Sequence, residues 1–159
     1  MNACFIGHRT IEMTNDRKNS LKEKIVTLIN YGVTTFLFGS MSKFNDLSWE
    51  ITTELKNTYP FIKRVYIRSA FPQISKAYEE YILKSYEDTY FPSNIENAGK
   101  CSYIKRNYEM IDNSEFCLFY YNENYIPPLK HSTKTHNSGT KIAYEYAKKK
   151  KKQIINLFP

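Results

Sequence analysis

The stretch VTTFLFGS, residues 33–40, decides the fold class that we expect for this 159-residue chain. Its first six residues are β-branched or aromatic, with the single exception of Leu37, and Gly39 follows them directly. This pattern is typical of a buried strand. Apolar residues recur at helical spacing before the stretch, over 16–30, and after it, over 47–58. A strand that lies between two helices in this way favours a parallel sheet.

The same alternation continues toward both ends of the chain. We expect further strands at residues 3–6, 63–67, 116–121 and 154–158, and further helices over 75–90, 103–113 and 140–151. No linker or repeat divides the sequence, so residues 1–159 are predicted to form a single domain. The predicted class is α/β: a Rossmann-like, doubly wound, mainly parallel sheet with helices on both faces.

The composition is that of a globular protein, with 42% hydrophobic and 25% charged residues, which excludes an intrinsically disordered chain. The formal net charge of +7 invites a nucleic-acid interpretation. Five of these charges, however, form one run, Lys148–Lys152, at the end of an expected helix, where lysines complement the helix dipole. Nonspecific nucleic-acid binding through this run is therefore only the third interpretation of function.

Signals for membranes, metals and disulfides are missing from the sequence. No stretch approaches the roughly 20 apolar residues that span a bilayer, and residues 1–7 lack the features of a signal peptide. Cys4, Cys101 and Cys117 have no metal-ligand spacing and form no obvious disulfide framework. We therefore expect a cytoplasmic protein without a membrane partner, a metal site or a cofactor.

Three turns that follow expected strands carry most of the functional information. Ligands of doubly wound sheets bind beyond the carboxyl ends of the strands, and a helix N-terminus attracts phosphate. The turns are residues 7–9 (GHR), 39–46 (GSMSKFND) and 138–140 (SGT), and a helix between them contributes residues 106–107 (RN). The expected ligand-binding residues are Gly7, His8, Arg9, Gly39, Ser40, Asn45, Arg106, Asn107, Ser138, Gly139 and Thr140. The alternative is simple helix capping, by Asn45 or Asp46 in the second turn and by a Ser or Thr in the third.

Two carboxylates near the second turn are the candidates for catalysis. Glu50 lies one turn into the expected helix, where it would reach a ribose hydroxyl or act as a general base, and Asp46 is the other carboxylate within reach. A glutamate on a solvated helix face is the commoner explanation for Glu50.

Two further regions have open interpretations. The polar loop 122–137 leads into the third turn and is a candidate lid, whereas its histidines, His131 and His136, lack the partners of a zinc site. The tyrosines of segment 78–108 are candidates for stacking on a base, for packing against the sheet, or for a contact in a homo-oligomer.

Four motifs resemble, in the same order, those of YpsA-like proteins in the SLOG superfamily. CFIGHR (residues 4–9) resembles the CFTGHR of that family, and residues 39–50 follow its GGxxGFDxLAAE segment without a gap. RNYEMIDNS (residues 106–114) resembles its RNxxMVDxSD, and SGT…YAKK (residues 138–149) resembles its GGTxxxxxYAKK. Together the motifs cover nearly the whole chain.

The resemblance implies a Rossmann-like domain that binds a nucleotide or nucleotide-derived ligand, and this is the leading functional expectation. The wider superfamily includes LOG phosphoribohydrolases, DprA-type DNA-binding proteins and ligand-sensing domains of bacterial defence systems. A nucleotide N-glycoside hydrolase is therefore the second interpretation. The sequence departs from the pattern of such a hydrolase in two places. Asn45 stands where the family usually has Asp. The LOG signature PGGxGTxxE is also absent, since the first glutamate after Thr140 is Glu145.

Overall fold

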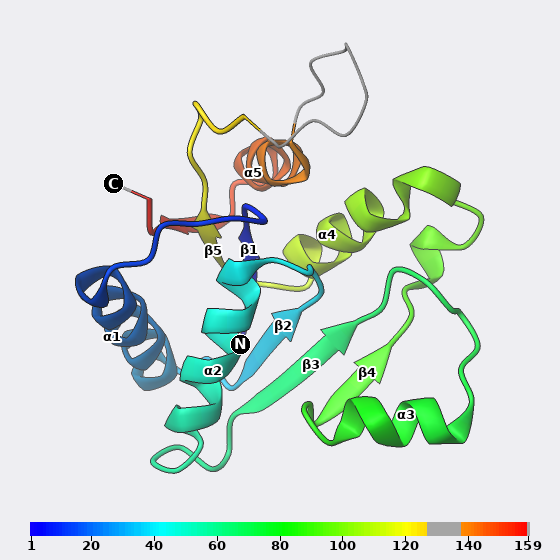
Figure 1. Ribbon diagram of the computed structural model, residues 1–159, viewed down its shortest axis with the longest axis horizontal. Helices are drawn as coiled ribbons and strands as arrows, with labels where there is room; N and C mark the ends of the chain where they lie inside the picture. The colour runs from blue at the N-terminus through cyan, green and yellow to red at the C-terminus, as the bar shows by residue number, and fades with distance from the viewer. Residues whose placement is uncertain (127–137, 159) are drawn as a thin grey trace.

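A computed structural model describes residues 1–126 and 138–158 and shows one six-stranded sheet covered by helices (Figure 1). The strands are β1 (Asn2–Gly7), β2 (Thr35–Phe38), β3 (Lys63–Ile67), β4 (Asp88–Tyr90), β5 (Phe116–Tyr120) and β6 (Gln153–Asn156). The helices are α1 (Asn15–Tyr31), α2 (Lys43–Leu55), α3 (Lys76–Leu83), α4 (Ser102–Asp112) and α5 (Gly139–Lys149), with short 3₁₀ helices at Ser93–Ile95 and Gly99–Cys101. The strand order is β4-β3-β2-β1-β5-β6, and each of these pairings is parallel, so the predicted α/β class is confirmed.

The two faces of the sheet bury two separate apolar cores. One core contains Phe5 and Phe36 together with buried residues of α1 and α2. The other contains Cys4 and Ile6 together with buried residues of α4 and α5. Successive residues of a strand point to opposite faces, so a strand that is covered on both faces must be apolar throughout. This is why uninterrupted apolar runs identify the central strands correctly.

β1 lies between β2 and β5, and the winding of the chain reverses at this position. The loop after β1 leads to α1 on one face of the sheet, whereas the loop after β5 leads toward α5 on the other face. Two loops that leave neighbouring strands in opposite directions open a crevice at the carboxyl end of the sheet.

The expected helix over residues 75–90 is wrong in its second half. α3 ends at Leu83, and Asp88–Tyr90 form β4, which lies at the edge of the sheet and pairs with β3. A three-residue edge strand that begins with two polar residues contains no alternation from which it could be recognised. The sequence pattern therefore predicts five of the six strands and misses β4.

α2 begins at Lys43, four residues earlier than the apolar spacing predicts. Ser42 is its N-cap, since the Oγ atom of Ser42 accepts a hydrogen bond of 3.1 Å from the backbone N–H of Asn45. Asn45 and Asp46 therefore lie inside the first turn, and the interpretation of either residue as the cap is wrong. Phe44 gives this additional turn its apolar contact, since its side chain is fully buried.

The other expected elements agree with the structure to within two residues at each end, apart from the end of α2. None of the helices that the structure describes is long and apolar enough to cross a membrane.

Candidate functional site

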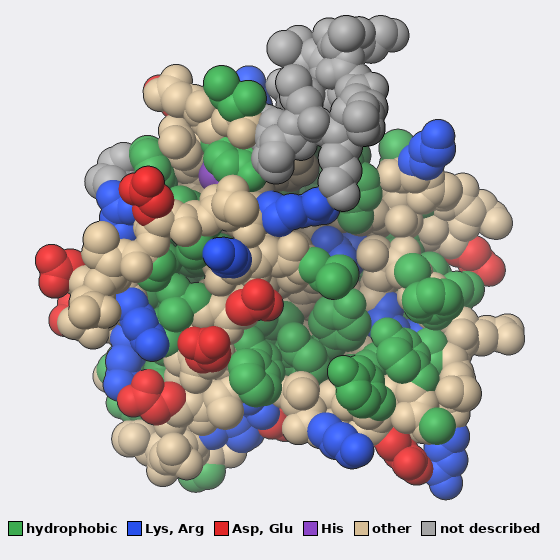
Figure 2. All heavy atoms as spheres, in the orientation of Figure 1, with side chains coloured by type: hydrophobic (Ala, Val, Ile, Leu, Met, Phe, Trp, Pro, Cys, Tyr) green, Lys and Arg blue, Asp and Glu red, His purple; other side chains and the backbone are tan. Residues whose placement is uncertain are grey.

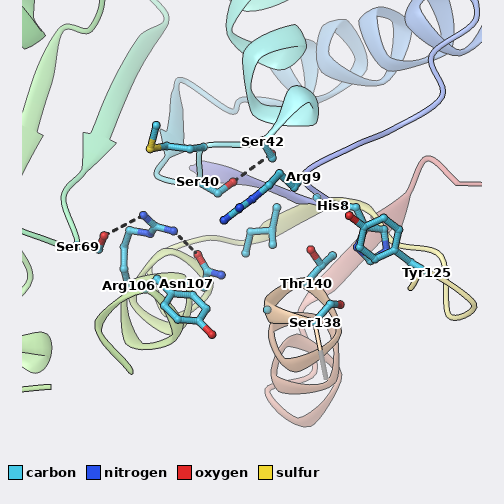
Figure 3. A pocket seen from close by; sticks show the side chains of 15 residues that line it. His8, Arg9, Ser40, Ser42, Ser69, Arg106, Asn107, Tyr125, Ser138 and Thr140 are labelled. Atoms are coloured by element: carbon cyan, nitrogen blue, oxygen red, sulfur yellow. Dashed lines mark hydrogen bonds between the residues drawn. The ribbon is translucent and has the colours of Figure 1, made fainter. Parts of the chain in front are cut away.

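A cavity of about 500 Å³ opens at the carboxyl ends of the central strands (Figure 3). Its walls come from the loops that follow β1, β2, β3 and β5 and from the N-terminal parts of α4 and α5. Small-molecule sites have volumes of about 300–1,000 Å³, so the cavity is large enough for a ligand of that size. The lining residues are Ile6, Gly7, His8, Arg9, Ser40, Met41, Ser42, Ser69, Tyr103, Arg106, Asn107, Tyr125, Ser138, Gly139 and Thr140.

Most of the expected ligand-binding residues meet in this lining, although they are far apart in the sequence. Those that line the cavity are Gly7, His8, Arg9, Ser40, Arg106, Asn107, Ser138, Gly139 and Thr140. Gly39 and Asn45 are not part of the lining, and the structure gives both of them supporting roles.

Two glycines allow side chains to approach the strand ends closely. A Cβ atom at Gly7 would lie 2.6 Å from the Cβ atom of Phe44, and a Cβ atom at Gly39 would lie 2.8 Å from the Cδ and Nε atoms of Arg106. In both cases the neighbouring side chain would have to shift, since optimal separations between such atoms are about 3.5–4 Å. Gly39 therefore makes room for a cavity side chain and does not face the cavity itself.

Asn45 holds the β2–α2 loop in place. Its Nδ2 atom donates a 2.7 Å hydrogen bond to the backbone carbonyl of Ser40, and its backbone N–H donates to Ser42. Since Ser40 and Ser42 line the cavity, Asn45 positions two lining residues from behind.

Arg106 is a buried cation without an acidic partner. The residue is only 6% exposed, and its burial lowers the pKa of the guanidinium group to about 10. Within the described chain its contacts are neutral: Nη1 donates to Ser69 Oγ and Nη2 donates to Asn107 Oδ1, both at 3.3 Å, while Nε has no partner. No carboxylate of the described residues forms a salt bridge with it. Buried charges in proteins are normally paired, so an anion bound in the cavity would supply the partner that Arg106 lacks among the described residues.

Arg9 brings a second positive charge to the cavity from the loop after β1. Its side chain is exposed and extends into the cavity toward the wall that carries Ser40 (Figure 3). Its backbone carbonyl accepts a 3.1 Å hydrogen bond from the N–H of Lys43, which ties this loop to the start of α2. The two arginines therefore reach the same cavity from different elements.

His8 is a buried side chain with one ring nitrogen in contact with the backbone of Asn122. Its Nε2 atom lies 2.9 Å from the backbone N–H of Asn122 and 3.2 Å from the carbonyl oxygen, and the shorter contact, in which Nε2 accepts, corresponds to the tautomer with the proton on Nδ1. Burial lowers the pKa of His8 below its usual 6.5, although the backbone of Asn122 acts in the opposite direction. The ring stacks on Tyr125 with the centroids 3.9 Å apart, and the buried Nδ1 atom has no partner among the described residues.

The N-terminus of α5 forms another wall of the cavity. Ser138 is the N-cap, since its Oγ atom accepts a 3.1 Å hydrogen bond from the N–H of Lys141, as the capping alternative predicts. The N–H groups of Gly139 and Thr140 precede the first intrahelical hydrogen bonds and therefore have no helical acceptor. Capping by Ser138 and binding of an anion by its neighbours are thus compatible.

The two candidate catalytic carboxylates do not reach the cavity. Asp46 and Glu50 are exposed on α2, and the lining contains neither Asp nor Glu. Across the described part of the chain, no group of three or more His, Cys, Asp and Glu side chains could hold a metal ion.

Sequence reasoning misses Ser69 and Tyr125 among the lining residues. Ser69 follows the end of β3 closely, so the rule that locates the other turns would have found it. Tyr103, one of the tyrosines considered for stacking on a base, does line the cavity, and its ring lies 3.1 Å from the position that a Cβ atom would take at Gly139. That contact depends on how α4 packs beside α5.

The lysine run has structural contacts in the folded chain. Lys150 Nζ lies 3.5 Å from Asp112 Oδ1, and Lys152 Nζ donates to the backbone carbonyls of Asp112 and Ser114. Lys148 and Lys149 lie in the last turn of α5, as expected for charges that complement the helix dipole.

The two regions with open interpretations behave differently. Residues 127–137 of the candidate lid lie outside the described residues, whereas Tyr125 just before them lines the cavity. Hydrophobic side chains gather around α3 on the face shown in Figure 2, and the exposed aromatic residues there include Phe71, Tyr78 and Tyr81, which lie outside the cavity lining.

No protein-family model matches the chain, and no curated protein matches it significantly. Function is therefore inferred from the chemistry of the cavity.

Proposed function

We propose that this protein binds a nucleotide or nucleotide-derived ligand, with phosphate held in the cavity at the carboxyl end of the sheet. The observation that carries the proposal is Arg106, a buried guanidinium group in the cavity wall that no carboxylate of the described chain neutralises. A phosphate group would neutralise Arg106, because the planar guanidinium group of arginine donates charge-assisted hydrogen bonds to phosphate oxygens.

The rest of the lining supports the same class of ligand. Arg9 adds a second cation, and the N-terminus of α5 adds backbone donors with a positive dipole. Tyr103 and Tyr125 offer aromatic surface for the organic part of the ligand. The GHR and SGT turns, which resemble those of YpsA-like proteins, both lie in the lining.

The cavity favours binding over hydrolysis of a glycosidic bond. Such hydrolysis ordinarily uses two carboxyl groups beside the scissile bond. The lining contains none, Asp46 and Glu50 are exposed elsewhere on α2, and residues 127–137 contain no Asp or Glu in their sequence. We therefore propose a binding protein and assign no reaction to it.

The proposal is tested by mass spectrometry of small molecules that co-purify with the native protein, followed by thermal-shift and calorimetric titration with nucleotides. A ligand that binds only the folded state raises the melting temperature, and the stabilisation grows with the logarithm of one plus the ratio of free ligand concentration to Kd. We expect nucleotides to stabilise the wild-type protein and to lose most of this effect on Arg106→Met.

The matched control is Lys22→Met, which also removes one positive charge. Lys22 lies on α1 outside the lining and forms an exposed pair with Glu54 at 2.7 Å. The control should respond to nucleotides as the wild type does. The proposal fails if no nucleotide at millimolar concentration shifts the melting temperature, or if Arg106→Met responds as strongly as the control.

A further inference from the structure

The cavity has two separate positions for anionic groups. Resting on the proposed function, we propose that the ligand carries two anionic groups at opposite ends, such as a nucleoside with a phosphate on each side of its sugar. A nucleotide with a single phosphate would then leave one of the two positions empty.

The first position lies at Arg106. Its Nε atom is buried and has no partner, and Nη1 and Nη2 are held by the neutral groups of Ser69 and Asn107. In Figure 3 the exposed Arg9 side chain extends toward this side of the cavity. Two guanidinium groups and a serine hydroxyl therefore serve one end of the ligand.

The second position lies at the start of α5, an 11-residue helix. The N–H groups of Gly139 and Thr140 have no acceptor within the helix. Thr140 is 93% buried and lines the cavity. An independent observation also points to a ligand on this side: His8 is 2% exposed, lines the same cavity, and keeps an unpaired Nδ1 among the described residues. In the tautomer that carries its proton on Nδ1, His8 is a donor like the N-terminus of α5, and both kinds of donor suit an anion.

The two positions lie on different sides of the cavity. Figure 3 shows Arg106 with Ser69 on one side of the cavity and Ser138 with Thr140 on the other. The Arg106 side chain passes over Gly39 toward Ser69, at the ends of β2 and β3.

The chain itself does not neutralise either position. The lining contains no carboxylate, so no acidic side chain satisfies the donors and none is present to recruit Mg²⁺ to bridge neighbouring phosphates. A ligand with two well-separated anionic groups satisfies both ends at once, with its sugar and base spanning the space between them. A diphosphate chain, in which the two phosphates are adjacent, does not.

The test uses three adenosine probes and the corresponding guanosine probes in calorimetric titration of the full chain: the 5′-monophosphate, the 5′-diphosphate and the 3′,5′-bisphosphate. A hydrogen bond to a charged group contributes about 10- to 150-fold in affinity. We therefore expect the bisphosphate to bind at least about tenfold more tightly than the monophosphate, and more tightly than the diphosphate, which carries the same number of phosphates.

Two variants address the positions separately. Gly139→Asp places a carboxylate at the first position of α5, where it suits the helix dipole but repels an anion. Its matched control is Asn15→Asp, which places a carboxylate at the exposed first position of α1, outside the lining. Arg106→Met removes the other position. Each of Gly139→Asp and Arg106→Met should abolish the advantage of the bisphosphate, whereas only one of the two should weaken binding of the monophosphate. Asn15→Asp should keep the full advantage.

The outcomes separate this inference from the proposed function. If no probe binds, the proposed function fails. If the monophosphate binds, but the bisphosphate and the diphosphate have the same affinity as each other within about twofold, the inference of two separated positions is overturned. The proposed function then still stands. Equal weakening of the monophosphate by Gly139→Asp and Arg106→Met would show that the two positions are one. Thermal melting of each variant, with Asn15→Asp as reference, separates loss of binding from loss of folding.

Discussion

Arg64 and Arg106 are almost equally buried, at 7% and 6% exposure, yet their surroundings are opposite. Arg64 lies near the amino end of β3, where Nε and Nη2 donate to the two carboxylate oxygens of Glu87 at 3.1 and 2.8 Å, and its guanidinium lies 5.5 Å from the ring centre of Trp49. Arg106 lies at the carboxyl end of the sheet and meets only neutral side chains within the described residues. At the amino end of the sheet the chain thus pairs its buried cation with a carboxylate, whereas at the carboxyl end the buried cation has no acidic partner among the described residues.

Arg64→Met should produce the largest effect. It leaves the carboxylate of Glu87 with two partners, Lys56 Nζ at 3.1 Å and the backbone N–H of residue 64. Removing one member of a buried ion pair destabilises proteins by about 3–5 kcal/mol, and since Glu87 is partly exposed we expect a loss of about 3 kcal/mol in the free energy of unfolding. Urea denaturation measures this loss in the free energy of unfolding, with Lys22→Met as the control. A loss no larger than that of the control would mean that the Arg64–Glu87 pair does not stabilise this end of the sheet.

Arg106→Met should act in the opposite direction on the ligand-free protein. Replacing an unpaired buried cation by an apolar side chain removes its desolvation penalty, so we expect a gain of about 1–3 kcal/mol in the free energy of unfolding. The same variant should lose ligand binding. Destabilisation on the scale of Arg64→Met would instead make Arg106 a structural residue, and the contrast between the two ends of the sheet would disappear.

The acid limb of the stability curve should depend on Glu87. Burial alone would raise the pKa of Glu87, but hydrogen bonds from the side chain and backbone of Arg64 and from Lys56 outweigh it and lower the pKa to about 2. A carboxyl whose pKa is lower in the folded state contributes stability above its unfolded value, and this contribution is lost as the pH falls from about 5 to about 2. After allowance for solvent screening we expect a loss of about 1–2 kcal/mol over this range.

Glu87→Gln tests this assignment, since it removes the titrating group and should flatten the pH dependence between pH 5 and 2. Glu54→Gln, at an exposed pair, is the control and should leave the curve close to that of the wild type. An unchanged acid limb in Glu87→Gln would place the titrating group elsewhere in the protein.

Gly39→Ala should have the smallest effect on stability and a clear effect on the site. The added methyl group would lie 2.8 Å from side-chain atoms of Arg106 and Met110, both of which can shift, so we expect a loss of about 1 kcal/mol. The displaced guanidinium should weaken nucleotide binding. Gly139→Ala is the variant to compare with it, because it also adds one methyl group close to a side chain of the lining. That methyl group would lie 3.1 Å from the partly exposed ring of Tyr103. Wild-type affinity in Gly39→Ala would show that the position of Arg106 does not matter for the ligand.

Several parts of the fold and site are predictable because they depend on local burial. The central strands are apolar on both faces, so each of them is visible in the sequence as an uninterrupted apolar run. Parallel strands all end at the same edge, so His8, Ser40 and Thr140 could be expected at one site from their places in the turns. The edge strand β4 and the N-cap Ser42 escape prediction, because neither depends on an apolar repeat.

The sequence by itself determined the parallel sheet and the edge at which a ligand should bind, since both depend on hydrophobic patterns that repeat over a few residues. Only the tertiary structure decided which charges meet. It paired Arg64 with Glu87, left Arg106 without a carboxylate among the described residues, and placed Asp46 and Glu50 on the outside of α2. The physical reason is that a charge interacts through space with whatever helix packing brings near it, and that packing joins residues far apart in the chain.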